Sequence, residues 1–150
     1  MRRVSFAEVA CPIAQSLEVI GEWWTLLIIR DAFFGVTRFD EFQENLGIAR
    51  NILASRLDTL VAAGVMERQC YDEGRARYDY VLTEKGRALW PVIVTLRQWG
   101  DEWILGEGNE ISLLRHKHCG EITTGVLVCD HCGEPLDQSN VRSVRGPASN

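Results

Sequence analysis

Cysteine and histidine residues near the end of the chain have the spacing of metal ligands. Cys129 and Cys132 form a C-x-x-C pair, His116 and Cys119 form an H-x-x-C pair, and a glycine follows each pair at once. Two such turns joined by a hairpin would present three thiolates and one neutral imidazole, a ligand set that structural zinc sites use with tetrahedral geometry. The spacing therefore predicts a small zinc ribbon over residues 112–137. Its metal would be structural, because four protein ligands leave no position for a substrate.

Two other interpretations of this segment stay open. A C-x-x-C pair can be redox-active, although no helical pattern follows Cys129, as is usual for such pairs. The thiols can also stay reduced in a metal-free hairpin. If zinc is bound, His118 or His131 could replace His116 as the fourth ligand.

The composition is that of a globular chain rather than a membrane or secreted one. Of the 150 residues, 46% are hydrophobic and 25% are charged, and the net charge of −5 argues against non-specific coating of nucleic acid. The apolar run from Trp23 to Ile29 is too short to cross a bilayer, and Glu8 falls where a signal peptide needs apolar residues. We therefore expect a cytoplasmic protein that does not associate with membranes. Its five cysteines favour metal binding, redox chemistry or burial over a disulfide framework.

Hydrophobic periodicity predicts the elements that must position the chemical groups. Helices are expected over residues 11–20, 22–34, 37–46, 49–64 and 84–105. Pro91 should kink or split the last of them. Two β-prone runs, at residues 65–71 and 77–82, flank a turn that contains glycine and acidic residues. A helix–turn–helix followed at once by a β-ribbon is the winged-helix arrangement.

The expected fold class is α+β, mainly α. Residues 8–105 would form a DNA-binding and dimerisation domain with a long C-terminal helix, residues 112–137 the Cys/His hairpin, and residues 138–150 a disordered tail. Thr37 and Asp40 are the expected cap of the third helix. Trp23 and Trp24 are expected to pack in the core.

The fourth predicted helix has one apolar side and one side of short polar residues. Leu53, Leu57 and Leu60 share a stripe, and Asn51 and Ser55 point the opposite way. In a winged helix this element lies in the DNA major groove and the ribbon reaches the flanking backbone. We therefore predict contacts with double-stranded DNA from Arg38, Arg50, Asn51, Ser55, Arg56, Arg75 and Arg77.

Three longer stretches carry a resemblance to a known family. CPIAQSLEVIGEWWTLLIIRDAFFGVTRFDEFQENL from Cys11, NILASRLDTLVAAGVMER from Asn51 and YVLTEKGRAL from Tyr80 resemble the HxlR-type transcriptional regulators, MarR-like winged-helix proteins of bacteria. The resemblance covers residues 8–105. It implies a homodimer on a palindromic operator and, in some members, a response to oxidants or reactive electrophiles.

The resemblance bears on two positions near helix starts. Cys11 precedes Pro12 and matches the sensing cysteine of redox-responsive members, so it is a redox-sensing candidate; the alternative is a small residue buried at a helix start. Family members often open the recognition helix with Ser-Pro, where this chain has Ala49-Arg50. The missing N-cap hydroxyl costs about 1 kcal/mol of helix stability, and Arg50 can compensate by contacting phosphate.

Together these patterns predict a sequence-specific, DNA-binding transcriptional regulator that acts as a homodimer, with a small molecule or an oxidant as effector. The alternative is a protein-interaction module built from a winged helix and a zinc ribbon, which the net acidity supports. We do not expect an enzyme, because the sequence has no phosphate-binding loop, no H-E-x-x-H and no serine elbow.

Overall fold

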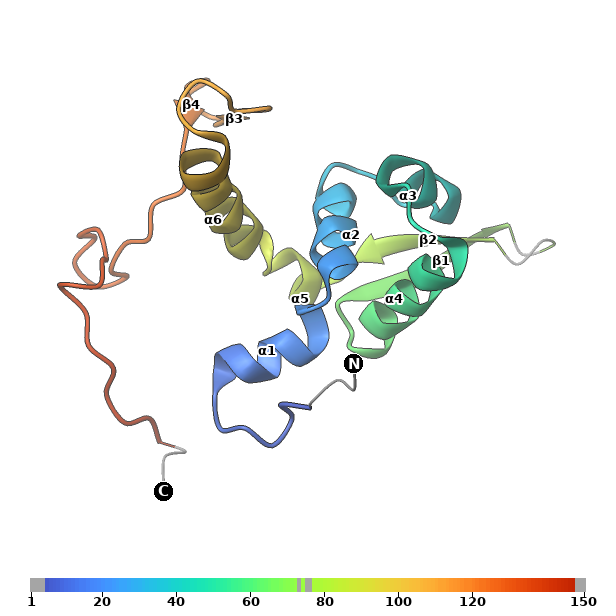
Figure 1. The fold of residues 1–150 in the computed structure, drawn as a ribbon, viewed down its shortest axis with the longest axis horizontal. Helices are drawn as coiled ribbons and strands as arrows, with labels where there is room; N and C mark the ends of the chain where they lie inside the picture. The colour runs from blue at the N-terminus through green and yellow to red at the C-terminus, as the bar shows by residue number, and fades with distance from the viewer. Residues whose placement is uncertain (1–4, 73, 75–76, 148–150) are drawn as a thin grey trace. The chain divides into compact units, whose positions relative to one another are not determined.

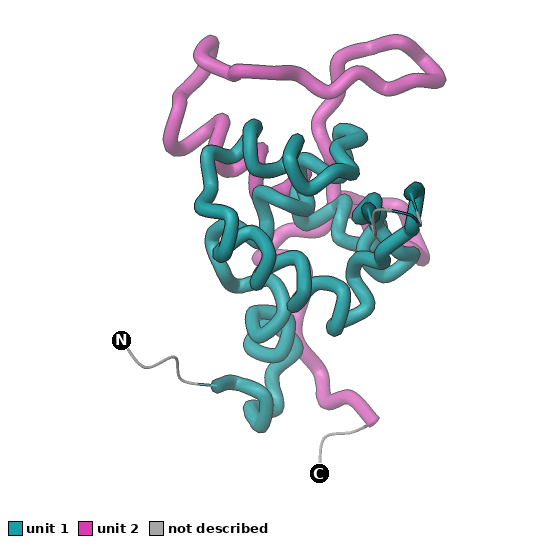
Figure 2. Tube along the Cα trace, turned by 90° about the vertical axis from the view of Figure 1, so that its right-hand side faces the viewer, with its two compact units in different colours: residues 1–93 teal, residues 94–150 magenta. Residues whose placement is uncertain are grey.

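The computed structural model describes residues 5–72, 74 and 77–147. The chain divides into two compact units, residues 1–93 and residues 94–150, which we describe separately (Figure 2). The division falls inside a helix, whereas the sequence placed the first domain boundary after residue 105. No helix among the described residues is long and apolar enough to span a membrane.

Unit 1 has the element order of a winged helix (Figure 1). Its elements are α1 (Pro12–Ile20), α2 (Trp23–Phe33), α3 (Phe39–Leu46), α4 (Arg50–Ala62), β1 (Met66–Asp72), β2 (Arg77–Leu82) and α5 (Glu84–Arg87). The strands pair antiparallel from Met66↔Leu82 to Asp72↔Arg77, with a register shift between Cys70 and Asp72. The predicted helix–turn–helix and its ribbon are therefore confirmed, and we call the β1–β2 hairpin the wing.

The core of unit 1 forms around α4. Leu53, Leu57 and Leu60 have no exposed surface, and they share a hydrophobic cluster with Ile28 of α2 and Phe42 of α3. Full burial of each such side chain stabilises the fold by about 1.5–3 kcal/mol. The apolar side of α4 is thus fixed against α2 and α3, which leaves its polar side exposed.

The start of α3 is tied to the wing. The Tyr80 amide donates to the Thr37 carbonyl at 2.7 Å, and the Thr37 hydroxyl donates to Asp79 Oδ1 at 2.9 Å. The predicted cap by Thr37 and Asp40 is wrong, because Glu41 accepts the Arg38 amide at 3.3 Å and Thr37 bonds across to β2 instead.

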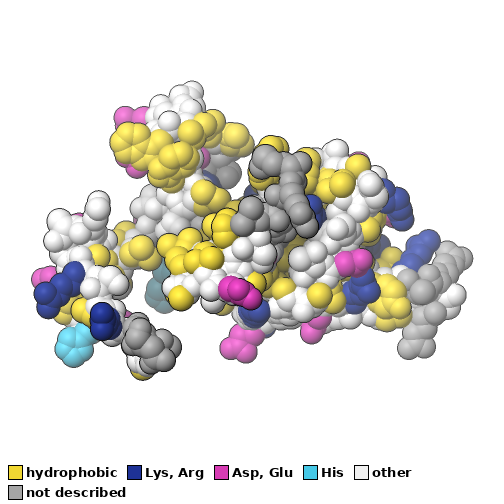
Figure 3. Space-filling view, turned by 60° about the horizontal axis from the view of Figure 1, so that its bottom comes forward, with side chains coloured by type: hydrophobic (Ala, Val, Ile, Leu, Met, Phe, Trp, Pro, Cys, Tyr) yellow, Lys and Arg dark blue, Asp and Glu magenta, His cyan; other side chains and the backbone are white. Residues whose placement is uncertain are grey.

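Two predicted apolar contacts differ in unit 1. The side chain of Trp23 is 87% exposed at the first residue of α2, so its predicted place in the core is wrong; Trp24 does pack against the core. In α1, Ile20 is buried, whereas Ile13 and Leu17 are exposed. Figure 3 shows that hydrophobic side chains occupy part of the surface of the chain.

Pro91 splits the last predicted helix, as expected. The chain forms α5, then α6 (Trp90–Gly100), and continues as the π-helix η2 (Asp101–Leu105). Proline is tolerated as the second residue of α6 because an amide there has no partner within the helix. Leu96, Trp99 and Trp103 lie exposed along α6 and η2.

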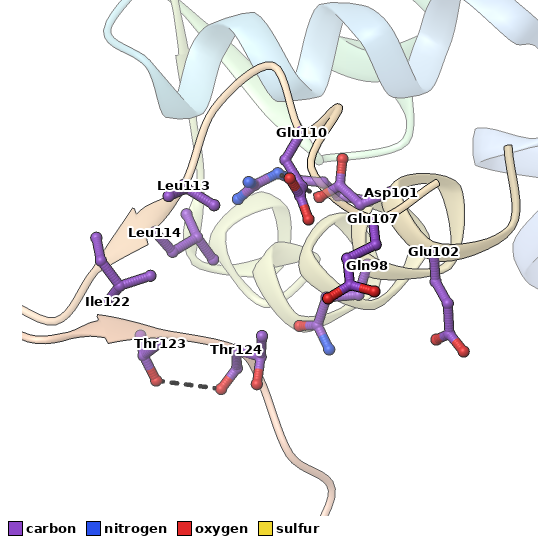
Figure 4. A pocket seen from close by; sticks show the side chains of 11 residues that line it. Gln98, Asp101, Glu102, Glu107, Glu110, Leu113, Leu114, Ile122, Thr123 and Thr124 are labelled. Atoms are coloured by element: carbon purple, nitrogen blue, oxygen red, sulfur yellow. Dashed lines mark hydrogen bonds and ion pairs between the residues drawn. The ribbon is translucent and has the colours of Figure 1, made fainter. Parts of the chain in front are cut away.

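Unit 2 contains a small hairpin of β3 (Leu114–Arg115) and β4 (Ile122–Thr123). After β4, Gly125 exchanges two hydrogen bonds with the Gln98 side chain of α6, at 2.7 and 2.9 Å. A pocket of about 670 Å³ is lined by α6, η2, the following loop and this hairpin (Figure 4). Acidic side chains such as Asp101, Glu107 and Glu110 border it, beside Arg97.

Candidate nucleic-acid interface

The exposed side of α4 carries three of the predicted DNA-binding residues. Arg50, Asn51 and Ser55 are all exposed, on the side opposite the buried leucines. Ala49 occupies the N-cap with extended backbone angles and without a side-chain cap. The first amides of a helix point outward with partial positive charge, so the uncapped start of α4 favours an anion.

Three of the predicted arginines line one groove beside that helix start. Arg38, Arg50 and Arg77 border a hollow of about 520 Å³, together with the rings of Tyr71 and Tyr78 from the wing. Phe39, Asp40, Glu41 and Tyr80 complete its lining. The fold thus gathers cationic groups from α4, the residue before α3 and the wing, although they are far apart in the sequence.

The groove arginines are held by aromatic rings and carboxylates. The guanidinium of Arg38 lies 4.7 Å from the Tyr71 ring centre, and its Nε is 3.8 Å from Asp79 Oδ1. That of Arg50 lies 4.6 Å from the Phe39 ring centre, and its Nη1 is 3.4 Å from Asp40 Oδ1. Exposed ion pairs of this kind contribute little stability, so a phosphate group can replace the carboxylate at small cost.

Two other predicted arginines stand apart from this groove. Arg56 pairs with Glu22, the N-cap residue of α2, with 3.2 Å between Nη2 and Oε2, and its side chain is only 22% exposed. Arg56 therefore links α4 to α2 and does not line the groove. Arg75 lies outside the described residues.

Sequence reasoning missed three residues at this surface. Tyr71 and Tyr78 line the groove, and Arg68 of β1 forms an ion pair with Asp58 on the outer side of α4. Arg68 thereby neutralises an acid that would repel phosphate. The sequence could have indicated these residues, because aromatic and basic side chains occupy exposed positions of the predicted ribbon.

The predicted metal ligands form two separate pairs. His116 Nδ1 lies 3.2 Å from Cys119 Sγ. The amides of Cys132 and His131 are directed at the Cys129 sulfur and lower the pKa of its thiol. Among the residues that the structure describes, no three or more such ligands gather in one group.

Cys11 is a partly exposed free thiol at the N-cap of α1.

Residues 19–107 match the protein family described as "HxlR-like helix-turn-helix". The match covers more than half of the chain and includes all of the helix–turn–helix and the wing. The chain belongs to the HxlR family. Among its relatives, the HTH-type transcriptional regulator Rv3095 of Mycobacterium tuberculosis is 48% identical over 136 residues, which cover 90% of this chain and 85% of the relative.

Two solved structures extend the comparison. The crystal structure of PA1607, a candidate transcription factor, is 41% identical with a TM-score of 0.85 and covers 95% of this chain and 100% of its own. The redox regulator HypR in its reduced form is 32% identical with a TM-score of 0.56, over 60% of this chain and 90% of its own. The likeness to PA1607 covers 95% of this chain, so it also includes residues of unit 2 beyond residue 107, where the family match ends.

Membership in the HxlR family decides between the two predicted functions. Its relatives are HTH-type transcriptional regulators, so this chain is a DNA-binding transcriptional regulator. The alternative of an interaction module without specific DNA binding is not favoured.

Proposed function

We propose that this regulator binds a palindromic operator as a homodimer, with α4 in the major groove and the wing over the flanking backbone. The observation that carries the proposal is the groove in which Arg38, Arg50 and Arg77 come together beside the exposed side of α4. The net charge of −5 is compatible with it, because DNA binding depends on where the cations lie.

The side chains of the interface divide into two roles. Asn51 and Ser55 have short polar groups that donate and accept hydrogen bonds, as recognition of base edges requires. Arg38 and Arg77 lie at the groove and bind phosphate, which fixes the position of the protein without reading sequence. Arg50 lies at the start of α4, where it can contact either a base edge or a phosphate.

Exposed apolar residues support the homodimer. In unit 2, Trp99 and Trp103 are 56% and 67% exposed, and in unit 1, Ile13 is 72% exposed. Large exposed apolar groups on helices mark interaction surfaces, and a second copy of the chain would cover them. A two-fold dimer also presents two α4 helices to half-sites about 34 Å apart, one turn of DNA.

Selection of bound duplexes from a random pool, followed by titration of the selected duplex, tests this proposal. We expect a palindrome whose affinity falls when one half-site is scrambled or when the half-sites are moved apart by half a helical turn. The affinity should also fall steeply with salt. Equal affinity for selected and scrambled duplexes would contradict the proposal and restore the interaction module.

An oxidant or reactive electrophile is the effector class that we propose for Cys11. The residue is partly exposed at the start of α1, and the similar protein HypR is a redox regulator. Treatment with diamide or hypochlorite should change operator affinity in the wild-type chain and in Cys70→Ser, but not in Cys11→Ser. An unchanged affinity in the treated wild-type chain would contradict this role.

A further inference from the structure

The tail of unit 2 contains the same short motif twice. Residues 116–121 read HKHCGE and residues 129–134 read CDHCGE, so four of the six positions are identical. The repeat extends beyond the ligand pairs, because each copy also contains a histidine at its third position and a glutamate at its end. Because the two copies are so similar in sequence, we expect them to adopt the same backbone conformation.

The first copy forms a closed turn, which we call knuckle 1 (residues 116–121). The Gly120 amide donates to the His116 carbonyl at 2.8 Å, and the His116 amide donates to the Glu121 carbonyl at 2.9 Å. Gly120 has a φ of +78°, which glycine adopts without strain. The pair Arg115↔Ile122 closes the turn at its base.

The second copy, knuckle 2 (residues 129–134), repeats each of these features. The Gly133 amide donates to the Cys129 carbonyl and the Cys129 amide to the Glu134 carbonyl, both at 2.8 Å. Gly133 has a φ of +76°, and the bridge Val128↔Pro135 closes the base. The chain therefore builds one backbone shape twice and places its Cys and His side chains at matching positions.

Within each knuckle the two potential ligand atoms already lie together. In knuckle 1, His116 Nδ1 and Cys119 Sγ are 3.2 Å apart. Tetrahedral zinc, with its usual Zn–N and Zn–S bonds, separates two such atoms by about 3.5 Å. In knuckle 2, Cys129 and Cys132 occupy the two corresponding positions of the same backbone turn, which places their side chains as it places those of His116 and Cys119.

We propose that the two knuckles of one chain bind a single Zn²⁺ through His116, Cys119, Cys129 and Cys132. Each knuckle supplies two ligands, whereas structural zinc sites have four. Three thiolates with one imidazole suit zinc rather than Mg²⁺ or Ca²⁺, which prefer oxygen ligands.

Binding must bring the two knuckles together, because no group of three ligands forms among the described residues. The connecting segment allows this movement. Gly125 is hydrogen-bonded to Gln98, and the residues between it and knuckle 2 are exposed: Val126 by 64%, Leu127 by 60% and Val128 by 50%. Because these residues are already exposed, a rotation of the segment would expose little additional apolar surface. The free energy of metal binding would then order the segment. The zinc would hold the two knuckles of the tail together and would not contact DNA.

Metal analysis of the 150-residue chain, purified without a histidine tag and dialysed against a weak chelator, tests the proposal. We expect one zinc per chain. Replacement by Co²⁺ should give the visible absorption of a tetrahedral, thiolate-rich site, and the cobalt titration should end at one equivalent. Cys119→Ser and Cys132→Ser should each lose the whole ion, because one ligand is removed from a shared site.

Two matched controls lie in the same tail, and a third lies in the wing. His118→Ala and His131→Ala should keep one zinc per chain, as should Cys70→Ser in the wing. A wild-type chain without zinc that also fails to bind Co²⁺ would overturn the proposal without reliance on any variant. Full zinc retained by either ligand variant would overturn it too. Zinc restored by mixing Cys119→Ser and Cys132→Ser chains would overturn the assignment of both knuckles to one chain.

Discussion

The hydroxyl of Thr37, which precedes α3, donates a 2.9 Å hydrogen bond to Asp79 in the second strand of the wing. The Tyr80 amide reinforces this junction by donating to the Thr37 carbonyl. The wing and the helix–turn–helix are therefore joined by both side-chain and backbone contacts. This junction gives Arg38 and Arg77 defined positions beside α4.

Replacing Thr37 tests the junction. Thr37→Val keeps the shape of the side chain but leaves the half-buried Asp79 carboxylate without this donor, so the free energy of unfolding should fall by about 1 kcal/mol. Thr37→Ser keeps the hydroxyl and is the matched control. Urea denaturation measures both, and equal midpoints for the two variants would show that the hydrogen bond contributes nothing.

A pair of glycine substitutions tests the packing of α5. Alanine normally favours a helix over glycine by about 1 kcal/mol. At Gly86, however, an added Cβ would lie 2.2 Å from the Val65 carbonyl oxygen, so Gly86→Ala should destabilise the fold by about 1–3 kcal/mol. At Gly100, nothing lies within 4 Å of the added atom.

Gly100→Ala should therefore stabilise the chain by up to about 1 kcal/mol, since Gly100 already has helical angles. Thermal unfolding of both variants distinguishes the cases. The same direction of change at both positions would contradict the close approach of α5 to Val65.

The two arginines of α4 should respond differently to removal. Arg50→Ala should lower the slope of log affinity against log salt by about 0.9, the effect of one lost phosphate contact. Arg56→Ala should leave that slope unchanged but lower the free energy of unfolding, because Arg56 pairs with Glu22. Arg56→Lys, which keeps the charge, is the control for the pair. Equal loss of slope in Arg50→Ala and Arg56→Ala would place Arg56 in the interface after all.

The proposed dimer surface is tested by charge. Trp99→Glu places a carboxylate on the exposed side of α6 and should shift the chain from dimer to monomer in analytical ultracentrifugation. Phe34→Glu alters a comparably exposed residue just after α2, 69% exposed, and should leave the dimer intact. An unchanged molecular mass in Trp99→Glu would exclude this part of α6 from the dimer contact.

Periodicity was sufficient to predict the winged helix from the sequence. Leu53, Leu57 and Leu60 repeat at helical spacing, and they fill the core as expected. Pro91 lacks an amide hydrogen, and the helix divides next to it. Both features are determined by residues close together in the sequence, so the pattern of residue types along the chain is enough to predict them.

Contacts between distant segments were beyond such reasoning. Nothing near Thr37 indicates that its hydroxyl bonds to Asp79 rather than capping α3. Arg56 and Arg50 are both arginines of α4, and only the packing on α2 gives one of them Glu22 as its partner. The apolar neighbours of Trp23 predict a place in the core, although its side chain at the first residue of α2 is exposed.

The most direct test of the account is the ratio of affinities for the selected operator and a scrambled duplex, measured for Asn51→Ala and for Arg77→Ala. Loss of a base contact at Asn51 should cut this ratio by about 5- to 150-fold, equivalent to about 1–3 kcal/mol. Arg77→Ala should weaken both duplexes by the same factor and leave the ratio unchanged. A ratio that Asn51→Ala leaves at the wild-type value would contradict recognition of DNA by the exposed side of α4.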